Sequence, residues 1–235
     1  MTEKIRLKKY GFNYQAIMQV LFFLTIAISV WAVRTHNSTL GSSFLKNSLK
    51  LIMYLLVIFE FIVTSILFFK KGKKTSLLLL MIAFWPVLYW LYIHIWVYDM
   101  ESWGITSPII CFLFALQSVE VKIRVFFYFK KFVIITSAIG ILFYIAYILK
   151  LSFPYEICPY YDEIPSRFYI NFSNISFLYK DNVTLRLCGI FNEPGWLGTT
   201  LGLMLCYERI NLKKIENIIM LIAGVLSFSV AFFLI

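Results

Sequence analysis

The sequence predicts an all-α protein, a polytopic bundle of about seven transmembrane helices. Three observations lead to this fold class: the composition, the long apolar runs and the placement of the basic residues. Of the 235 residues, 61% are hydrophobic and only 14% are charged, and the mean hydropathy is +0.81. A soluble domain is about half apolar and about a quarter charged. The balance therefore predicts a single integral membrane domain over residues 1–235, surrounded by membrane lipids.

Seven apolar runs are long enough to cross a hydrocarbon layer of roughly 30 Å. They cover about residues 14–33, 51–69, 75–98, 103–119, 132–149, 187–207 and 218–235. A basic segment, Met1–Tyr10, precedes the first run without a small-residue cleavage site, which favours an uncleaved first helix. The last run reaches Ile235 without a flanking anchor residue. This predicts a C-terminally truncated chain, and an intact seven-helix protein with an abrupt end is the alternative.

The basic residues predict the orientation of the chain in the membrane. Fifteen of the 22 lie before the first run or in the second, fourth and sixth connections between runs. The other seven lie in the alternate connections, four of them from Lys150 to Arg186. Cytoplasmic loops collect Lys and Arg, so the N-terminus is expected in the cytoplasm and the loop 150–185 outside. The same placement accounts for the net charge of +10, and no nucleic acid is expected as a partner.

The outward loop 150–185 is rich in aromatic residues, unlike a disordered linker. We expect it to pack as a cap on the outer face. Asp162 and Glu163 in this loop are candidates to contact sugar hydroxyls, and solvated acids are the alternative. Cys158 and Cys188 flank the loop's polar part; an oxidising compartment permits a disulfide between them, and two thiols are the alternative.

A charged segment interrupts the sixth run. Charged groups at membrane depth cost roughly 2.5–3.5 kcal/mol each, so they usually face a cavity and carry function. Proline is favoured at the first helical position, so a helix is expected to begin at Pro194 with Glu193 at its cap. From Pro194 to Tyr207 such a helix is about 21 Å long, too short to cross the membrane.

The stretch 185–192 is therefore expected to enter the membrane as irregular or separately helical backbone, which gives one broken helix near 186–195. The helix N-terminus and Arg186 then face one space, and an anion is the expected occupant. In the alternative, Arg186 reaches the outer interface and pairs with Glu193.

The pattern Arg186-x-x-Gly189-x-Phe191-x-Glu193-Pro194-Gly195 resembles the O-antigen polymerase and O-antigen ligase superfamily. In that superfamily an R-x-x-G-x-F-x-x-P pattern follows a long outward loop and opens an apolar helix. The Glu-Pro-Gly form is most similar to the polysaccharide repeat-unit polymerases. The resemblance covers about 15 residues, and this chain lacks the further spans and the second large outward loop that family members usually have.

The resemblance implies a metal-independent glycosyltransferase of the bacterial cytoplasmic membrane that needs no cofactor. It implies polymerisation of undecaprenyl-pyrophosphate-linked oligosaccharides of a surface polysaccharide, such as an O antigen, capsule or exopolysaccharide. A flippase and a chain-length regulator are the implied protein partners. The catalytic residues carried over are Arg186, which engages the pyrophosphate leaving group, and Glu193. The residues expected to shape the substrate site are Gly189, Asn192, Pro194 and Gly195. An O-antigen-ligase-type transferase and a transporter or flippase are the alternatives.

Two further residues are weaker candidates. His94 lies near the outer end of the third run, where it is a candidate substrate-binding residue and general base for a sugar hydroxyl. A place in an aromatic interface belt is the alternative. Glu60 lies in the middle of the second run, and an intramembrane acid indicates function unless it is a neutral helix contact. No cluster of His and Cys predicts a metal site.

Overall fold

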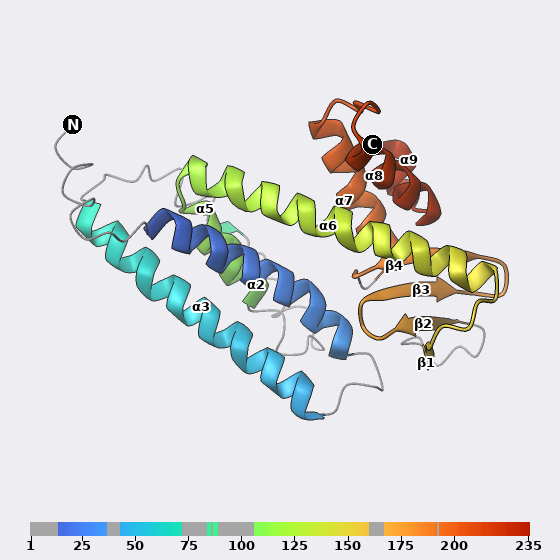
Figure 1. Ribbon diagram of the computed structural model, residues 1–235. Helices are drawn as coiled ribbons and strands as arrows, with labels where there is room; N and C mark the ends of the chain where they lie inside the picture. The colour runs from blue at the N-terminus through green and yellow to red at the C-terminus, as the bar shows by residue number, and fades with distance from the viewer. Residues whose placement is uncertain are drawn as a thin grey trace. The chain divides into compact units, whose positions relative to one another are not determined.

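The computed structural model describes residues 14–36, 43–71, 84–85, 87–88, 106–159, 167–191 and 193–235. This part of the chain is mostly helical and contains one small antiparallel sheet (Figure 1). The chain divides into two compact units. Unit 1 comprises residues 1–29 and 48–128, and unit 2 comprises residues 30–47 and 129–235.

The described residues of unit 1 lie mainly in four helices. They are most of α2 (Tyr14–His36), most of α3 (Ser43–Lys71), α5 (Thr106–Ala115) and the first part of α6 (Val119–Ile148). Their apolar side chains form a core of Met18, Phe22, Val57, Ile110, Leu113, Val121 and Val125. Hydrogen bonds between side chains also join the helices: the Thr25 hydroxyl lies 2.6 Å from a Glu60 carboxyl oxygen, and the Gln117 amide donates to the Thr64 hydroxyl at 3.0 Å.

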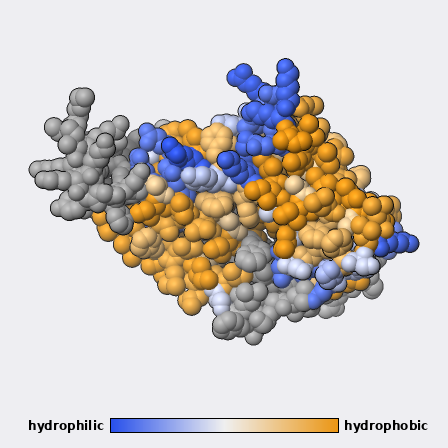
Figure 2. Space-filling view, viewed as in Figure 1, coloured by the Kyte–Doolittle hydropathy of each residue, from blue (hydrophilic) through white to orange (hydrophobic). Residues whose placement is uncertain are grey.

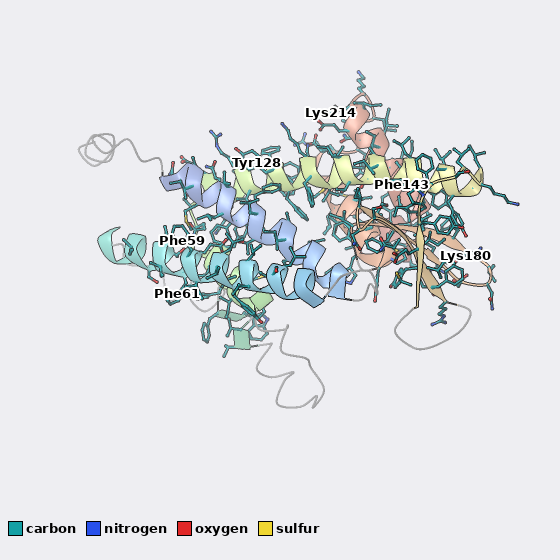
Figure 3. All side chains as sticks on the ribbon, turned by 60° about the horizontal axis from the view of Figure 1, so that its bottom comes forward. Phe59, Phe61, Tyr128, Phe143, Lys180 and Lys214 are labelled. Carbon is teal, nitrogen blue, oxygen red and sulfur yellow. The ribbon has the colours of Figure 1, made fainter. Side chains whose placement is uncertain are left out.

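Unit 2 contains the end of α2, the start of α3 and the rest of α6, followed by α7 (Pro194–Tyr207), α8 (Ile215–Leu226) and α9 (Val230–Leu234). Small residues let α7 and the segment before α9 approach closely. A Cβ atom added at Gly198 would overlap Ser229 and lie 2.8 Å from the Ser227 hydroxyl. The loop between α7 and α8 carries charged side chains, among them Lys214 (Figure 3).

The sheet of unit 2 is an antiparallel meander of four strands in the order β1-β2-β3-β4. The strands are β1 (Glu156–Pro159), β2 (Phe168–Phe172), β3 (Ser176–Lys180) and β4 (Leu185–Gly189). One face packs against the C-terminal half of α6, where the Phe143 and Phe172 rings stack at 4.6 Å and the Tyr144 hydroxyl donates to the Leu185 carbonyl at 3.1 Å (Figures 1 and 3). On the other face, Cys158, Tyr169, Phe177, Tyr179 and Cys188 form a buried cluster.

The all-α prediction is therefore wrong for the four strands at 156–159, 168–172, 176–180 and 185–189. The segments 168–172 and 176–180 are rich in the aromatic and β-branched residues that favour strands. Short turns join β2 to β3 at 173–175 and β3 to β4 at 181–184. The aromatic residues of the expected cap thus pack within a sheet. Strands of four or five residues have too few positions for alternation to stand out in such an apolar composition.

Seven spans are not supported. Within the described ranges, α6 is the one helix long and apolar enough to cross a membrane, while the apolar helices at Gln15–Val30, Leu51–Ile66 and Ile215–Leu226 are shorter. The run 103–119 contains the ten-residue α5 and a turn, and the run 218–235 is divided by a turn at Ser227–Phe228. Of the run 75–98, only 84–85 and 87–88 are described. Hydropathy counts apolar residues, and it does not show where the backbone turns.

Many apolar side chains of the helices point outward (Figure 2). On α3 they include Leu51, Leu55, Ile58, Phe59 and Ile62; on α6 and α7 they include Ile135, Leu142, Ile145 and Leu203. In Figure 2, hydrophilic side chains gather instead at the loop that joins α7 and α8. A helix that is apolar on its exposed face as well as its packed face is typical of an apolar surrounding such as a membrane.

Candidate functional site

Helix α7 begins and ends where the sequence predicts. It runs from Pro194 to Tyr207, with Pro194 at its first turn and Glu193 as its N-cap in an extended conformation (φ −138, ψ 150). The Glu193 side chain is exposed and makes no capping hydrogen bond. Gly195 is also exposed, and a Cβ atom added there would meet nothing within 4 Å. The helix start is therefore an open surface formed by Glu193, Pro194 and Gly195.

The segment before this helix differs from the prediction. Residues Leu185–Gly189 form strand β4 rather than irregular or helical backbone, so a broken helix near 186–195 is wrong. Gly189 ends the strand in the left-handed region (φ +58), which glycine adopts without a Cβ penalty. The Phe191 N–H then donates to the Cys188 carbonyl at 3.0 Å, which closes the turn. The arrangement is strand, turn and helix, and the transporter alternative has no broken helix here to support it.

Arg186 lies on β4 beside Tyr179 of β3, its partner in the strand register. Its guanidinium carbon lies 5.8 Å from the centre of the Tyr179 ring, a cation–π distance. Its Nε donates to the Thr184 hydroxyl at 3.0 Å, and its Nη2 lies 3.7 Å from a carboxylate oxygen of Asp181. The side chain remains 35% exposed. Arg186 is thus held in a fixed orientation but still reaches solvent.

Asp181 organises the turn that holds Arg186. One carboxylate oxygen accepts hydrogen bonds from the backbone N–H groups of Thr184 at 2.6 Å and Val183 at 2.9 Å, and the other accepts from the Thr184 hydroxyl at 2.9 Å. The backbone N–H groups of Thr184 and Val183 hold the pKa of Asp181 below its ordinary value, and Arg186 lowers it further. The ion partner of Arg186 is therefore Asp181, and the alternative pairing with Glu193 is not formed.

Several other expectations fall on parts of the chain outside the described residues. They are Asn192, His94, Asp162 and Glu163. Glu60 is described in unit 1: it is fully buried, it shares a hydrogen bond with Thr25, and its second carboxyl oxygen has no hydrogen-bond partner within the described part of the chain. It belongs to a different unit from Arg186.

The cysteine pair is resolved in favour of two thiols. Cys158 and Cys188 are both buried and neither forms a disulfide. They lie on β1 and β4, the two outer strands of the sheet. Three strand spacings separate such positions by about 14 Å, whereas a disulfide requires Cα atoms within about 7 Å.

A pocket in unit 2 contains two residues that sequence reasoning did not single out. Lys150 and Lys180 line a cavity of about 620 Å³ between the end of α6 and the sheet, together with Tyr147 and Tyr155. Both lysines entered the sequence argument only as charges of the outward loop. Basic residues are usually concentrated in cytoplasmic loops. The presence of Lys150 and Lys180 in the loop predicted to lie outside was therefore the sequence signal that could have marked them as functional.

Comparison of the chain with models of protein families, with curated proteins and with solved structures finds no match.

Proposed function

We propose that this protein is a membrane glycosyltransferase that polymerises lipid-diphosphate-linked oligosaccharide repeat units of a bacterial surface polysaccharide. The observation that carries the proposal is the connection from β4 to α7. It holds a partly exposed Arg186 on a strand, a left-handed Gly189 and an open helix start at Glu193 and Pro194. These residues are the ones that carry the resemblance to repeat-unit polymerases, and the fold presents them in one continuous segment.

The proposed reaction transfers a growing glycan from its lipid diphosphate to a hydroxyl of a second lipid-linked unit. The hydroxyl oxygen forms a bond to the anomeric carbon, and the bond from that carbon to the diphosphate oxygen breaks. The leaving diphosphate takes the electron pair, and we assign Glu193 to receive the hydroxyl proton. Arg186 binds the phosphate oxygens, because a guanidinium offers two parallel donors that match them. The diphosphate then takes the place of Asp181 as the anionic partner of Arg186.

The surroundings support a membrane location. Helix α6 is 30 residues long, and it is long and apolar enough to cross a membrane. The apolar exposed faces of α6 and α7 agree with lipid contact. In unit 2 the charged loop between α7 and α8 and the sheet lie at opposite ends of the helices (Figure 3). We therefore propose the bacterial cytoplasmic membrane as the location, with the sheet outside.

The test replaces Arg186 in the bacterium that makes the protein and measures the length distribution of its surface polysaccharide. Arg186→Lys keeps the charge but loses the planar pair of donors. Loss of one contact that stabilises the leaving group lowers the rate a hundredfold or more, about 3–4 kcal/mol. We expect both Arg186→Lys and Arg186→Ala to abolish long chains at an unchanged protein level. Arg167→Lys, which changes an exposed arginine just before β2, is the matched control.

Two results would overturn the proposal. One is a normal chain-length distribution in Arg186→Lys at a normal protein level, since a structural arginine is replaced well by lysine. The other comes from reporter fusions, which should signal outside at position 165 and inside at positions 72, 127 and 213. Reversed signals would place Arg186 on the cytoplasmic face, away from the lipid-linked substrate.

A further inference from the structure

We infer that the cavity between the end of α6 and the sheet is a binding site for a saccharide that carries a negative charge. That the ligand is a saccharide rests on the proposed function. That the ligand is negatively charged rests on the residues that line the cavity. The cavity has a volume of about 620 Å³, within the range of small-molecule sites. It lies wholly within unit 2.

The charged groups of this cavity are both hydrogen-bond donors. Lys180 and Lys150 supply ammonium groups, which donate three hydrogen bonds each and accept none. Among the described residues, no acidic side chain lines the cavity or forms an ion pair with either lysine. A neutral sugar presents hydroxyl donors that need acceptors, and Asp, Glu or amide side chains usually provide them. A lining of two cations therefore favours a ligand with carboxylate or phosphate oxygens.

Lys180 is held in place by aromatic rings. Its Nζ lies 3.5 Å from the Tyr147 hydroxyl, 5.7 Å from the centre of the Tyr147 ring and 5.8 Å from the centre of the Phe168 ring. These are contacts with a hydroxyl and with ring faces, so the positive charge is not neutralised by them. Figure 3 shows Lys180 at the sheet end of unit 2. The Lys180 ammonium group donates to the Tyr147 hydroxyl and has two further hydrogen-bond donors that an anionic ligand can accept from.

Lys150 is positioned by the end of helix α6. The Leu151 N–H donates to the Ala146 carbonyl at 3.0 Å and the Lys150 N–H to the Tyr147 carbonyl at 3.1 Å, with Lys150 in the left-handed region (φ 54). This is the usual way in which a helix ends and its chain reverses. Lys150 thus lines the cavity from the end of α6, whereas Lys180 lines it from β3.

Aromatic rings supply the rest of the lining. Phe153 and Tyr155 are each 47% exposed, and the Tyr155 ring packs edge-on against Tyr147 at 5.7 Å and at a tilt against Phe172 at 5.9 Å. Rings fixed against one another keep their exposed faces in place without loss of side-chain entropy on binding. Exposed ring faces beside fixed cations suit a pyranose ring that bears an acidic group.

The test measures binding to the purified protein in detergent by calorimetry. The probes are a disaccharide that contains one hexuronic acid, the same disaccharide with the carboxylate reduced to an alcohol, and a hexose phosphate. We expect the uronic-acid probe or the hexose phosphate to bind at least tenfold more tightly than the neutral probe, with binding weakened by added salt. Whichever anionic probe binds more tightly identifies carboxylate or phosphate as the charged group.

Variants locate the site. Lys180→Gln and Lys150→Gln should each weaken the binding of the anionic probe about tenfold or more, since each removes a charged hydrogen-bond donor. Lys180→Arg should retain it within a few-fold, which shows that the cavity remains folded. Lys213→Gln, at the opposite end of unit 2, is the matched control and should change nothing.

Three results would overturn the inference. Equal binding of the neutral and acidic probes would remove the requirement for a charge. Unchanged binding in both glutamine variants would place the anion elsewhere. Retention of phosphatidylglycerol by the native protein but not by Lys180→Gln, with no saccharide bound, would assign the cavity to a lipid headgroup. The proposed transferase activity stands or falls separately, because its test is the polysaccharide length in the Arg186 variants.

Discussion

Removal of the Glu208 carboxylate should weaken the packing of the helices of unit 2. Glu208 follows α7, and its carboxylate accepts hydrogen bonds from Lys130 of α6 at 2.6 Å and from Lys214, just before α8, at 2.5 Å. The side chains of Lys130 and Glu208 are only 6% and 8% exposed. Lys130 has a second carboxylate within reach, that of Glu216 at 3.6 Å. One carboxylate therefore joins the end of α7 to α6 through a nearly buried ion pair with Lys130, and to the start of α8 through an exposed pair with Lys214.

The magnitude follows from the burial of Lys130. Removing one partner of a buried ion pair costs about 3–5 kcal/mol, because the remaining charge is left without compensation. Glu216 still lies near Lys130 in a Glu208→Gln variant, so we expect the lower end of this range, about 3 kcal/mol. Such a loss lowers the ratio of folded to unfolded protein by more than about a hundredfold. Glu216→Gln is the matched control: Glu216 is 43% exposed and its contact is longer, so about 1 kcal/mol or less is expected.

The assay is the free energy of unfolding, measured by adding sodium dodecyl sulfate to the protein in a mild detergent. The pH dependence gives a second readout. The hydrogen bond from Lys130, and then that from Lys214, holds the pKa of Glu208 below its ordinary value. A lowered pKa contributes stability that is present above the unfolded-state value, about 4.3, and that is lost as the pH falls through the folded-state value. Native protein should lose this increment in acid, and Glu208→Gln should not. A cost for Glu208→Gln no greater than that for Glu216→Gln would refute the reasoning.

Three other predictions concern unit 2. Gly198→Ala should destabilise by about 1–3 kcal/mol through overpacking, whereas Gly195→Ala, which meets open space, should be neutral; equal effects in thermal unfolding would contradict this. Asp181→Asn should loosen the turn after β3, which would be measured as faster amide exchange in that turn. The pKa of Asp181 is lowered in the folded protein, so native protein should show the same loosening only when the pH falls below the ordinary carboxyl range. Cys158 and Cys188 should both react with an alkylating reagent after denaturation without reductant, and a quantitative disulfide in the mass map would disprove the strand order.

The sequence by itself determined the helix that follows Arg186. Pro194 has a fixed φ and no N–H to satisfy, so it marks the first turn of α7, and the apolar run after it ends at Tyr207 as predicted. The mostly helical character also follows from the sequence, because long apolar runs without strand-like interruptions leave few other ways to satisfy the backbone. These are local properties, set by a few neighbouring residues.

Only the tertiary structure decided what lies before that helix. The sequence of Leu185–Gly189 does not by itself distinguish a strand from the start of an apolar helix. It forms a strand because its backbone pairs with β3 in an antiparallel ladder of hydrogen bonds. The same pairing brings Asp181 to Arg186 and sets Lys180 near the end of α6, some thirty residues from Lys150. Contacts between residues so far apart in the chain depend on how the turns direct each strand. Residue types and their spacing do not show in which direction a turn sends the next strand. The Arg186 ion pair and the cavity lined by Lys150 and Lys180 are therefore visible only in the folded chain.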